Sequence, residues 1–107
     1  MNLNKLLPLT ETTYYILLAL IEPLHGYGII LRVKALSADS VDIAPGTLYG
    51  ALENLSKQKL IVLTAEDAEK RRKIYALTDL GRQVVGMEYS RLKRLVEISQ
   101  PLLEGII

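Results

Sequence analysis

The chain has 107 residues, half of them apolar, and a formal net charge of +1, which favours one folded domain and excludes a mainly disordered chain. It contains no Cys, which excludes disulfides and thiolate metal sites and fits a reducing compartment. The longest strongly apolar run, residues 14–21, is shorter than the roughly 20 residues that span a bilayer, and no signal-peptide cleavage pattern follows it. We therefore expect a cytoplasmic protein with no membrane partner.

The first predicted element is a helix that Thr10 or Thr12 caps and that runs to about Glu22, where Pro23 ends it. This helix is apolar on nearly every side. A helix with that pattern is buried all round, and in so small a domain this favours burial against a second subunit.

Two further helices are predicted before the middle of the chain. The run His25-Gly26-Tyr27-Gly28 opens a helix that covers residues 29–36, and a loop follows it. Pro45 disfavours a helical conformation at the residue before it and suits a first turn, so a third helix begins there.

The second half of the chain predicts a β-hairpin and a long helix. Residues 60–64 and 73–77 are strand-like, and a polar segment joins them. Thr78 then caps a last helix that continues to about Ser99. The predicted fold is mainly α with a small β-hairpin: a winged helix-turn-helix DNA-binding domain over residues 1–77, and a C-terminal dimerisation helix over residues 78–107.

The third helix separates into an apolar face and a polar face on a helical wheel. Hydroxyls, an amide, a cation and glycines line the polar face, and such groups suit the major groove of DNA. Gly50 costs the helix about 1 kcal/mol relative to Ala, which close approach of the backbone to DNA would explain. Glu53 is expected to point to solvent. The DNA-binding candidates on this helix are Thr47, Tyr49, Gly50, Asn54 and Lys57.

A run of four cations, residues 70–73, begins the second strand of the hairpin. A basic hairpin beside a recognition helix can lie along the phosphate backbone or enter the minor groove. Acids at 66, 67 and 69 offer the alternative that these charges pair among themselves on a solvated face. Arg71, Arg72 and Lys73 are the predicted DNA contacts of this wing.

The last helix carries an apolar stripe with alternating spacings of four and three residues, as in helices that pair. Pro101 is expected to kink or break this helix near residues 97–100. An apolar effector is expected to enter between the first and last helices, where Tyr15, Met87 and Tyr89 line a site. The predicted dimer interface consists of Tyr14, Tyr15, Leu18, Val85, Tyr89, Leu92, Val96 and Leu103.

Three segments together resemble the PadR family of transcriptional regulators. The segments are residues 15–20 leading to His25-Gly26-Tyr27-Gly28, the run Pro45-Gly46-Thr47-Leu48-Tyr49-Gly50-Ala51-Leu52, and Arg71-Arg72-Lys73-Ile74-Tyr75-Ala76-Leu77-Thr78 followed by Gly81.

The resemblance implies a homodimer with a single C-terminal helix that represses its operator and is often released by a small molecule. It also implies that Thr47 and Tyr49 contact DNA and that Lys73 acts from the wing. Lys59 departs from the pattern, because family members commonly have Gly after the recognition helix.

Two other classes of function compete with this one. An enzyme is disfavoured, because His25 is the single His and the serines have no evident base partner. No catalytic residues, metal ligands or cofactors are therefore predicted. A winged helix used only for protein interaction stays open as the alternative, since Lys57 is the one cation on the exposed arc of the third helix. The sequence does not identify the operator, the regulated gene or the effector.

Overall fold

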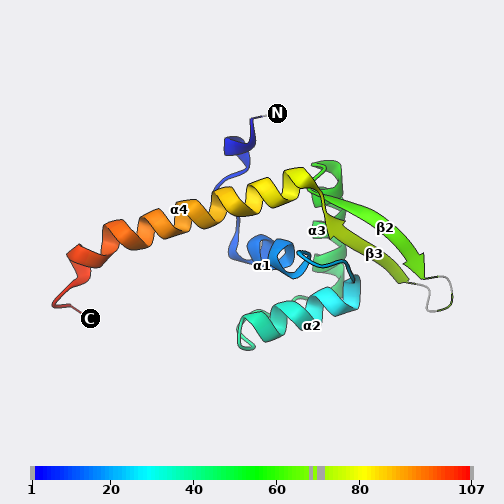
Figure 1. The fold of residues 1–107 in the computed structure, drawn as a ribbon. Coiled ribbons are helices and arrows are strands. Elements are labelled where there is room, and N and C mark those ends of the chain that lie inside the picture. The colour runs from blue at the N-terminus through cyan, green and yellow to red at the C-terminus, as the bar shows by residue number, and fades with distance from the viewer. Residues whose placement is uncertain (1, 68, 70–71, 107) are drawn as a thin grey trace.

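The computed structural model describes residues 2–67, 69 and 72–106, and it is a winged helix with a long appended helix (Figure 1). A 3-10 helix precedes the elements that the sequence predicted. In chain order the elements are η1 (Leu3–Leu6), α1 (Glu11–Ala19), β1 (Leu24–His25), α2 (Gly26–Leu36), α3 (Pro45–Lys57), β2 (Ile61–Asp67), β3 (Arg72–Leu77) and α4 (Asp79–Leu103).

Threonine side chains cap two of the helices, as the sequence predicted. Thr10 Oγ1 accepts a hydrogen bond from the Thr13 N–H at 3.1 Å, and Thr78 Oγ1 accepts one from the Gly81 N–H at 3.0 Å. The prediction that α1 runs to about Glu22 was wrong, since the helix ends at Ala19. The Leu20 carbonyl instead accepts a hydrogen bond from the Leu77 N–H at 3.4 Å, which joins the end of α1 to the sheet.

The sheet has three antiparallel strands in the order β1-β3-β2, so the predicted hairpin is confirmed and one strand was missed. The missed strand, β1, has two residues and pairs His25 with Ile74. The hairpin strands are longer than predicted, and β2 carries an irregularity between Leu63 and Ala65. Because β1 pairs with β3, the start of α2 lies directly beside the wing.

The junction between α3 and β2 is a tight helix-ending turn with a left-handed residue. Lys59 has φ 63°. Its N–H donates to the Ser56 carbonyl and the Leu60 N–H donates to the Leu55 carbonyl, both at 3.0 Å. These are the two hydrogen bonds of a Schellman motif, whose left-handed position is usually a glycine. The turn sends the chain from α3 straight into the wing.

The core lies between the first three helices, the sheet and the start of α4. Ile16, Leu17 and Leu20 are fully buried within this single chain, together with Ile29 and Leu48. The prediction that α1 owes its burial to a second subunit was therefore wrong for these residues, because the domain's own helices cover them.

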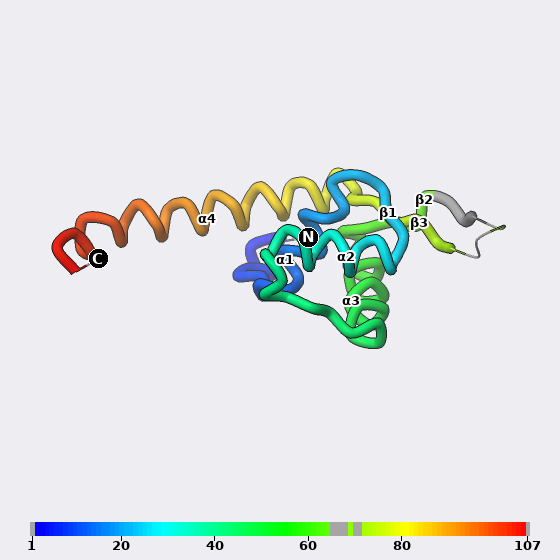
Figure 2. The backbone as a smooth tube through the Cα atoms, turned by 90° about the horizontal axis from the view of Figure 1, so that it is seen from below, coloured from blue at the N-terminus to red at the C-terminus, as the bar shows by residue number. Residues whose placement is uncertain are grey.

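Helix α4 begins inside the domain and then leaves it. Figures 1 and 2 show it extending away from the body, on the side opposite to the wing. Its first turns are packed so closely that a Cβ on Gly81 would lie 2.0 Å from the Leu60 carbonyl oxygen. The predicted end near Ser99 was wrong, since the helix continues through Pro101 to Leu103. The expected break near residues 97–100 was wrong as well, because Pro101 stands in the last turn, where its missing N–H removes a single hydrogen bond to the preceding turn.

Candidate nucleic-acid interface

The exposed face of α3 has the composition that the helical wheel predicted. Leu48, Leu52 and Leu55 are buried, whereas Thr47 and Gly50 are exposed. A Cβ added at Gly50 would meet no atom within 4 Å, and the same holds for Gly46. The first half of α3 therefore exposes its backbone at Gly46 and Gly50 and the hydroxyl of Thr47, so the surface of a ligand could approach this backbone closely.

Tyr49 extends from α3 over the beginning of α2. A Cβ on Gly26 would lie 2.6 Å from the Tyr49 hydroxyl oxygen, so the glycine makes room for the ring. Tyr49 as a whole still exposes 53% of its surface. Tyr49 is thus held by α2 on one side and open to a ligand on the other.

The remaining α3 candidates differ in their surroundings. Lys57 forms an ion pair with Glu53 at 3.4 Å, so Glu53 faces solvent as expected but also offsets this cation. Such an exposed pair contributes little to stability. Asn54 lies on the other side of the helix, where it lines a hollow with Leu9 and Thr10. Asn54 therefore lies toward the N-terminal segment, whereas Lys57 lies toward the wing.

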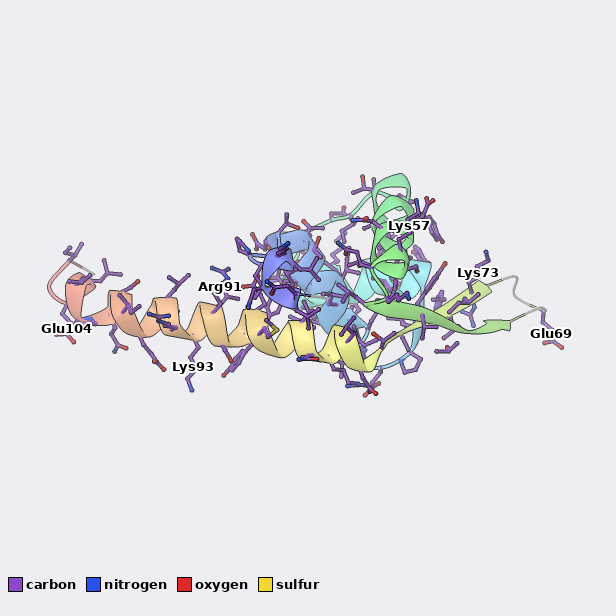
Figure 3. All side chains as sticks on the ribbon, turned by 90° about the horizontal axis from the view of Figure 1, so that it is seen from above. Lys57, Glu69, Lys73, Arg91, Lys93 and Glu104 are labelled. Atoms are coloured by element: carbon purple, nitrogen blue, oxygen red, sulfur yellow. The ribbon has the colours of Figure 1, made fainter. Side chains whose placement is uncertain are left out.

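The wing residues are divided between an exposed cation and a half-buried one. Lys73 is exposed, and Figure 3 shows it on β3, with Glu69 at the end of the hairpin. Arg72 is half-buried, and its Nη1 lies 3.4 Å from Nε2 of His25. The predicted contact Arg71 lies outside the described residues. The backbones of Glu66 and Asp67 pair with those of Lys73 and Arg72.

Two hollows adjoin each other between α3 and the wing. The first has a volume of about 500 Å³ and is formed by the start of α2, Tyr49 and strand β3. The second, about 460 Å³, runs along α3 and has Lys57 and Lys73 on its walls. Tyr49, Lys73 and Tyr75 line both. The structure therefore brings the predicted residues Tyr49, Lys57, Arg72 and Lys73 to one concave surface.

Sequence reasoning missed the contribution of α2 to this surface. His25, Gly26 and Tyr27 line the first hollow, although the sequence analysis placed His25 only at the start of a helix. The sequence feature that could have indicated this contribution is Tyr27 between Gly26 and Gly28. It points to the wing only once β1 is known to pair with β3. That pairing joins residues about fifty positions apart.

The apolar stripe of α4 is exposed in the second half of the helix. Gly81, Val84 and Glu88 are buried on the side that meets the domain. The same side continues past the domain, where it has no cover among the described residues of this chain. From Tyr89 onward the exposed large apolar side chains are Tyr89, Leu92, Leu95, Val96, Ile98, Leu102 and Leu103 on α4, and Ile106 just after the helix.

The predicted interface and effector residues lie in three different surroundings. Tyr14, Leu18, Val85 and Tyr89 line a mostly apolar hollow of about 320 Å³ between α1 and α4. Tyr15 packs against the core. Met87 lines a separate hollow between α4 and the N-terminal segment. The structure thus does not gather Tyr15, Met87 and Tyr89 in one pocket.

Glu88 is a buried carboxylate that the sequence analysis did not single out. Its side chain is 1% exposed, accepts a hydrogen bond from the Leu9 N–H and pairs with Arg91. Burial raises the pKa of the nearby Tyr14, and the negative charge of Glu88 and the neighbouring Tyr89 raise it further. Glu88 therefore fastens the N-terminal segment to α4.

No three His, Cys, Asp or Glu residues in the described part of the chain are grouped so that they could hold a metal ion. No helix in that part is both long and apolar enough to cross a membrane.

The fold and its concave basic face define a class of protein, the winged-helix proteins with an appended helix. Within that class, residues 16–87 match the transcriptional regulator PadR-like family. Because the match covers more than half of the chain, the chain belongs to this family of transcriptional regulators. The resemblance found in the sequence is thereby confirmed.

Solved structures of the same family are similar over most of their length. The PadR-like transcription factor from Bacteroides fragilis is 29% identical with a TM-score of 0.72, over 85% of this chain and 88% of that one. A PadR family regulator from Eggerthella lenta DSM 2243 is also 29% identical, with a TM-score of 0.69, over 87% and 81% of the two chains.

A curated relative is similar over a shorter part of its own length. An uncharacterized 37.1 kDa protein in transposon Tn4556 of Streptomyces fradiae is 35% identical over 73 residues, or 68% of this chain. The chain spans only 20% of that relative.

Proposed function

We propose that this chain is a transcriptional repressor that binds a near-palindromic operator as a homodimer and is released by a small molecule. The observation that carries the proposal is the concave surface between α3 and the wing, with Lys57 and Lys73 on its walls. In this proposal residues 1–77 bind DNA and residues 78–107 dimerise.

The recognition helix α3 enters the major groove in this proposal, and the wing follows the phosphate backbone. Thr47 and Tyr49 supply hydroxyls at the exposed start of α3, and Gly50 permits close approach of the backbone. Lys73, and Arg71 beyond the described residues, neutralise phosphates. The same cations disfavour a winged helix that serves only protein interaction.

The dimer forms through α4. Its N-terminal half already buries one side against the domain, and the apolar continuation of that side is exposed, with Val96 at 65% and Leu102 at 73%. An apolar surface of this length on a small protein is typical of an interaction site. The partner that fits this surface is the α4 of a second copy of the chain, because its apolar stripe has the same alternating four- and three-residue spacing.

An effector is proposed to enter next to this interface. The apolar hollow of Tyr14, Leu18, Val85 and Tyr89 has a volume within the range of small-molecule sites, roughly 300–1,000 Å³. It lies where α1 of the DNA-binding domain meets α4. A ligand there can change the angle between the two DNA-binding domains of a dimer.

The test is DNA binding as a function of salt, measured by fluorescence anisotropy on duplex fragments selected from the source genome. If a dimer neutralises about eight phosphates, log K falls with log salt at a slope of about −7. Thr47→Ala is expected to weaken binding to the selected fragments and to leave binding to arbitrary duplex unchanged. Lys73→Gln is expected to weaken both, and Lys93→Gln on α4 serves as its charge-matched control. Absence of binding at low salt would refute the proposal and favour protein interaction alone.

A further inference from the structure

The N-terminal segment, residues 2–9, crosses α4 on its way to α1. Figure 1 shows η1 and α1 on opposite sides of α4, and the chain between them passes that helix. Leu3 is buried in the core, and Leu6, Leu7 and Leu9 pack against the core. The segment is therefore a packed part of the domain, and it lies against the helix that is proposed to dimerise.

Glu88 fixes the point at which the segment crosses α4. Its carboxylate accepts a hydrogen bond from the Leu9 N–H with one oxygen and from Arg91 with the other. Hydrogen bonds to an ionised group are roughly twice as strong as those between neutral groups. Leu9 directly precedes Thr10, the N-cap residue of α1. Glu88 thereby ties the start of α1 to α4.

The same segment also lies beside α3. Leu6 and Pro8 line a hollow of about 200 Å³ together with Asn54 and other residues of α3. Leu7, which stands between Leu6 and Pro8 in the chain, instead lines the hollow of about 670 Å³ along α4. The segment therefore lies between the two helices, with neighbouring residues directed to one or the other.

The main packing of the domain joins α4 to α1 and β3, and α3 to α2 and β2. The N-terminal segment adds a link between α4 and α3. Protein interiors are normally close-packed, so the hollow between the segment and α3 means that packing holds the segment incompletely there. The hydrogen bond from Leu9 to Glu88 is then the contact that determines where the segment lies.

We propose that Glu88 is a positioning residue for DNA binding, which holds α3 in a fixed orientation to α4 through the N-terminal segment. The proposal rests on the function proposed above, in which α4 joins two subunits and α3 reads DNA. In such a dimer the bond between Glu88 and Leu9 helps to set the distance between the two recognition helices. An operator presents its half-sites at one spacing, so a dimer that keeps this distance binds it best.

The first experiment uses Glu88→Gln and needs no DNA. The amide has one acceptor oxygen in place of two, so the bonds to Leu9 and Arg91, which use different oxygens, cannot both persist. The backbone amide signals of ¹⁵N-labelled protein are compared with those of the wild type. Shifts are expected at Leu9 and also on α3, at Ala51 and Asn54.

The matched control is Glu97→Gln, which removes the same charge from an exposed position further along α4. It should leave the signals of α3 unchanged. If Glu88→Gln shifts Leu9 but not the signals of α3, Glu88 only anchors the N-terminal segment, and the proposal is overturned.

The second experiment measures the affinity for operator fragments whose half-sites have the selected spacing or one base pair more. If Glu88→Gln leaves about one dimer in ten with matching recognition helices, the Kd for the selected spacing rises about tenfold. The preference for that spacing falls with it, while the affinity for arbitrary duplex is unchanged. A variant that was merely less stable would lose affinity for both spacings in the same proportion.

Leu6→Ala tests the other end of the link. Leu6 is half-buried beside α3, so its truncation loosens the segment there and leaves Glu88 with its partners. This variant should also reduce the preference for the selected spacing. Thermal unfolding and sedimentation establish that each variant is folded and dimeric, and Leu6→Ala decides the question if Glu88→Gln does not fold.

The outcomes separate the link between the helices from its use in DNA binding. Shifts on α3 together with a reduced spacing preference support the proposal. Shifts on α3 with an unchanged preference in both variants overturn the role in DNA binding. If the wild type binds no duplex at all, the proposed function fails, and the signals of α3 still decide whether Glu88 positions that helix.

Discussion

The proposed α4 interface predicts that charge on its apolar stripe dissociates the dimer without unfolding the chain. The change is Leu92→Asp together with Val96→Asp. In the single chain these side chains are 37% and 65% exposed, so their carboxylates stay in contact with water when the subunits are apart. In the proposed dimer the same positions meet the partner helix, where an unpaired charge has no compensation.

The magnitude follows from symmetry. Two substitutions in each of two subunits place four carboxylates at the interface. If each costs about 2 kcal/mol, a low value for a buried unpaired charge, the dimer loses about 8 kcal/mol. Since about 1.4 kcal/mol corresponds to a factor of ten, a nanomolar dissociation constant becomes approximately millimolar. The variant is therefore expected to be monomeric at micromolar concentration.

The assay is analytical ultracentrifugation, with circular dichroism to confirm that the monomer is folded. The matched control is Gln83→Asp with Ser90→Asp, which adds the same charge on the opposite side of α4. When the dimer dissociates, the affinity for the operator should fall as well, because a monomer presents only one recognition helix. If the double variant still sediments as a dimer at micromolar concentration, the interface lies elsewhere on the chain. In that case there is also no reason to expect an effector site beside α4.

Three further predictions concern stability and ionisation. Lys59→Gly is expected to raise the free energy of unfolding by about 0.5–1 kcal/mol, because φ 63° suits glycine; Lys59→Ala keeps a Cβ and so should change little, and equal urea unfolding curves for the two variants would contradict this. Gly81→Ala is expected to cost about 1–3 kcal/mol, since its Cβ meets a backbone carbonyl, whereas Gly86→Ala, with open space around it, should stabilise α4 by up to about 1 kcal/mol; thermal melts that rank these variants in the reverse order would show that the packing is different. Because the pKa of Tyr14 is raised in the folded chain, its contribution to stability is present below about pH 10 and is lost as pH rises through the raised value. Absorbance titration near 295 nm should find that Tyr14→Phe removes a late-ionising tyrosine, and an unchanged titration curve would count against this.

Helix α3 was predictable because its determinants are local. Pro45 begins it, and apolar residues at three- and four-residue spacing define its buried side, so Leu48 and Leu52 could be assigned to the core from the sequence. The caps at Thr10 and Thr78 were predictable for the same reason, since each hydroxyl bonds a backbone N–H only three residues away.

The composition of the candidate site was only partly predictable. Tyr49, Lys57, Arg72 and Lys73 stand in segments that were predicted to lie side by side, and they share one concave surface. His25 was not expected there. It reaches the wing because β1, a strand of two residues, pairs with β3, and so short a segment has no periodicity that marks it as a strand.

The sequence by itself determined the order of the elements, the polar and apolar sides of α3 and the apolar stripe of α4, because these depend on neighbours within a few residues. The tertiary structure decided which apolar surfaces the single chain buries. Helix α1 and the second half of α4 are both rich in apolar residues, yet Leu17 of α1 is fully covered and Val96 of α4 is mostly exposed. The difference arises because the domain closes around α1, whereas α4 is longer than the domain against which it packs.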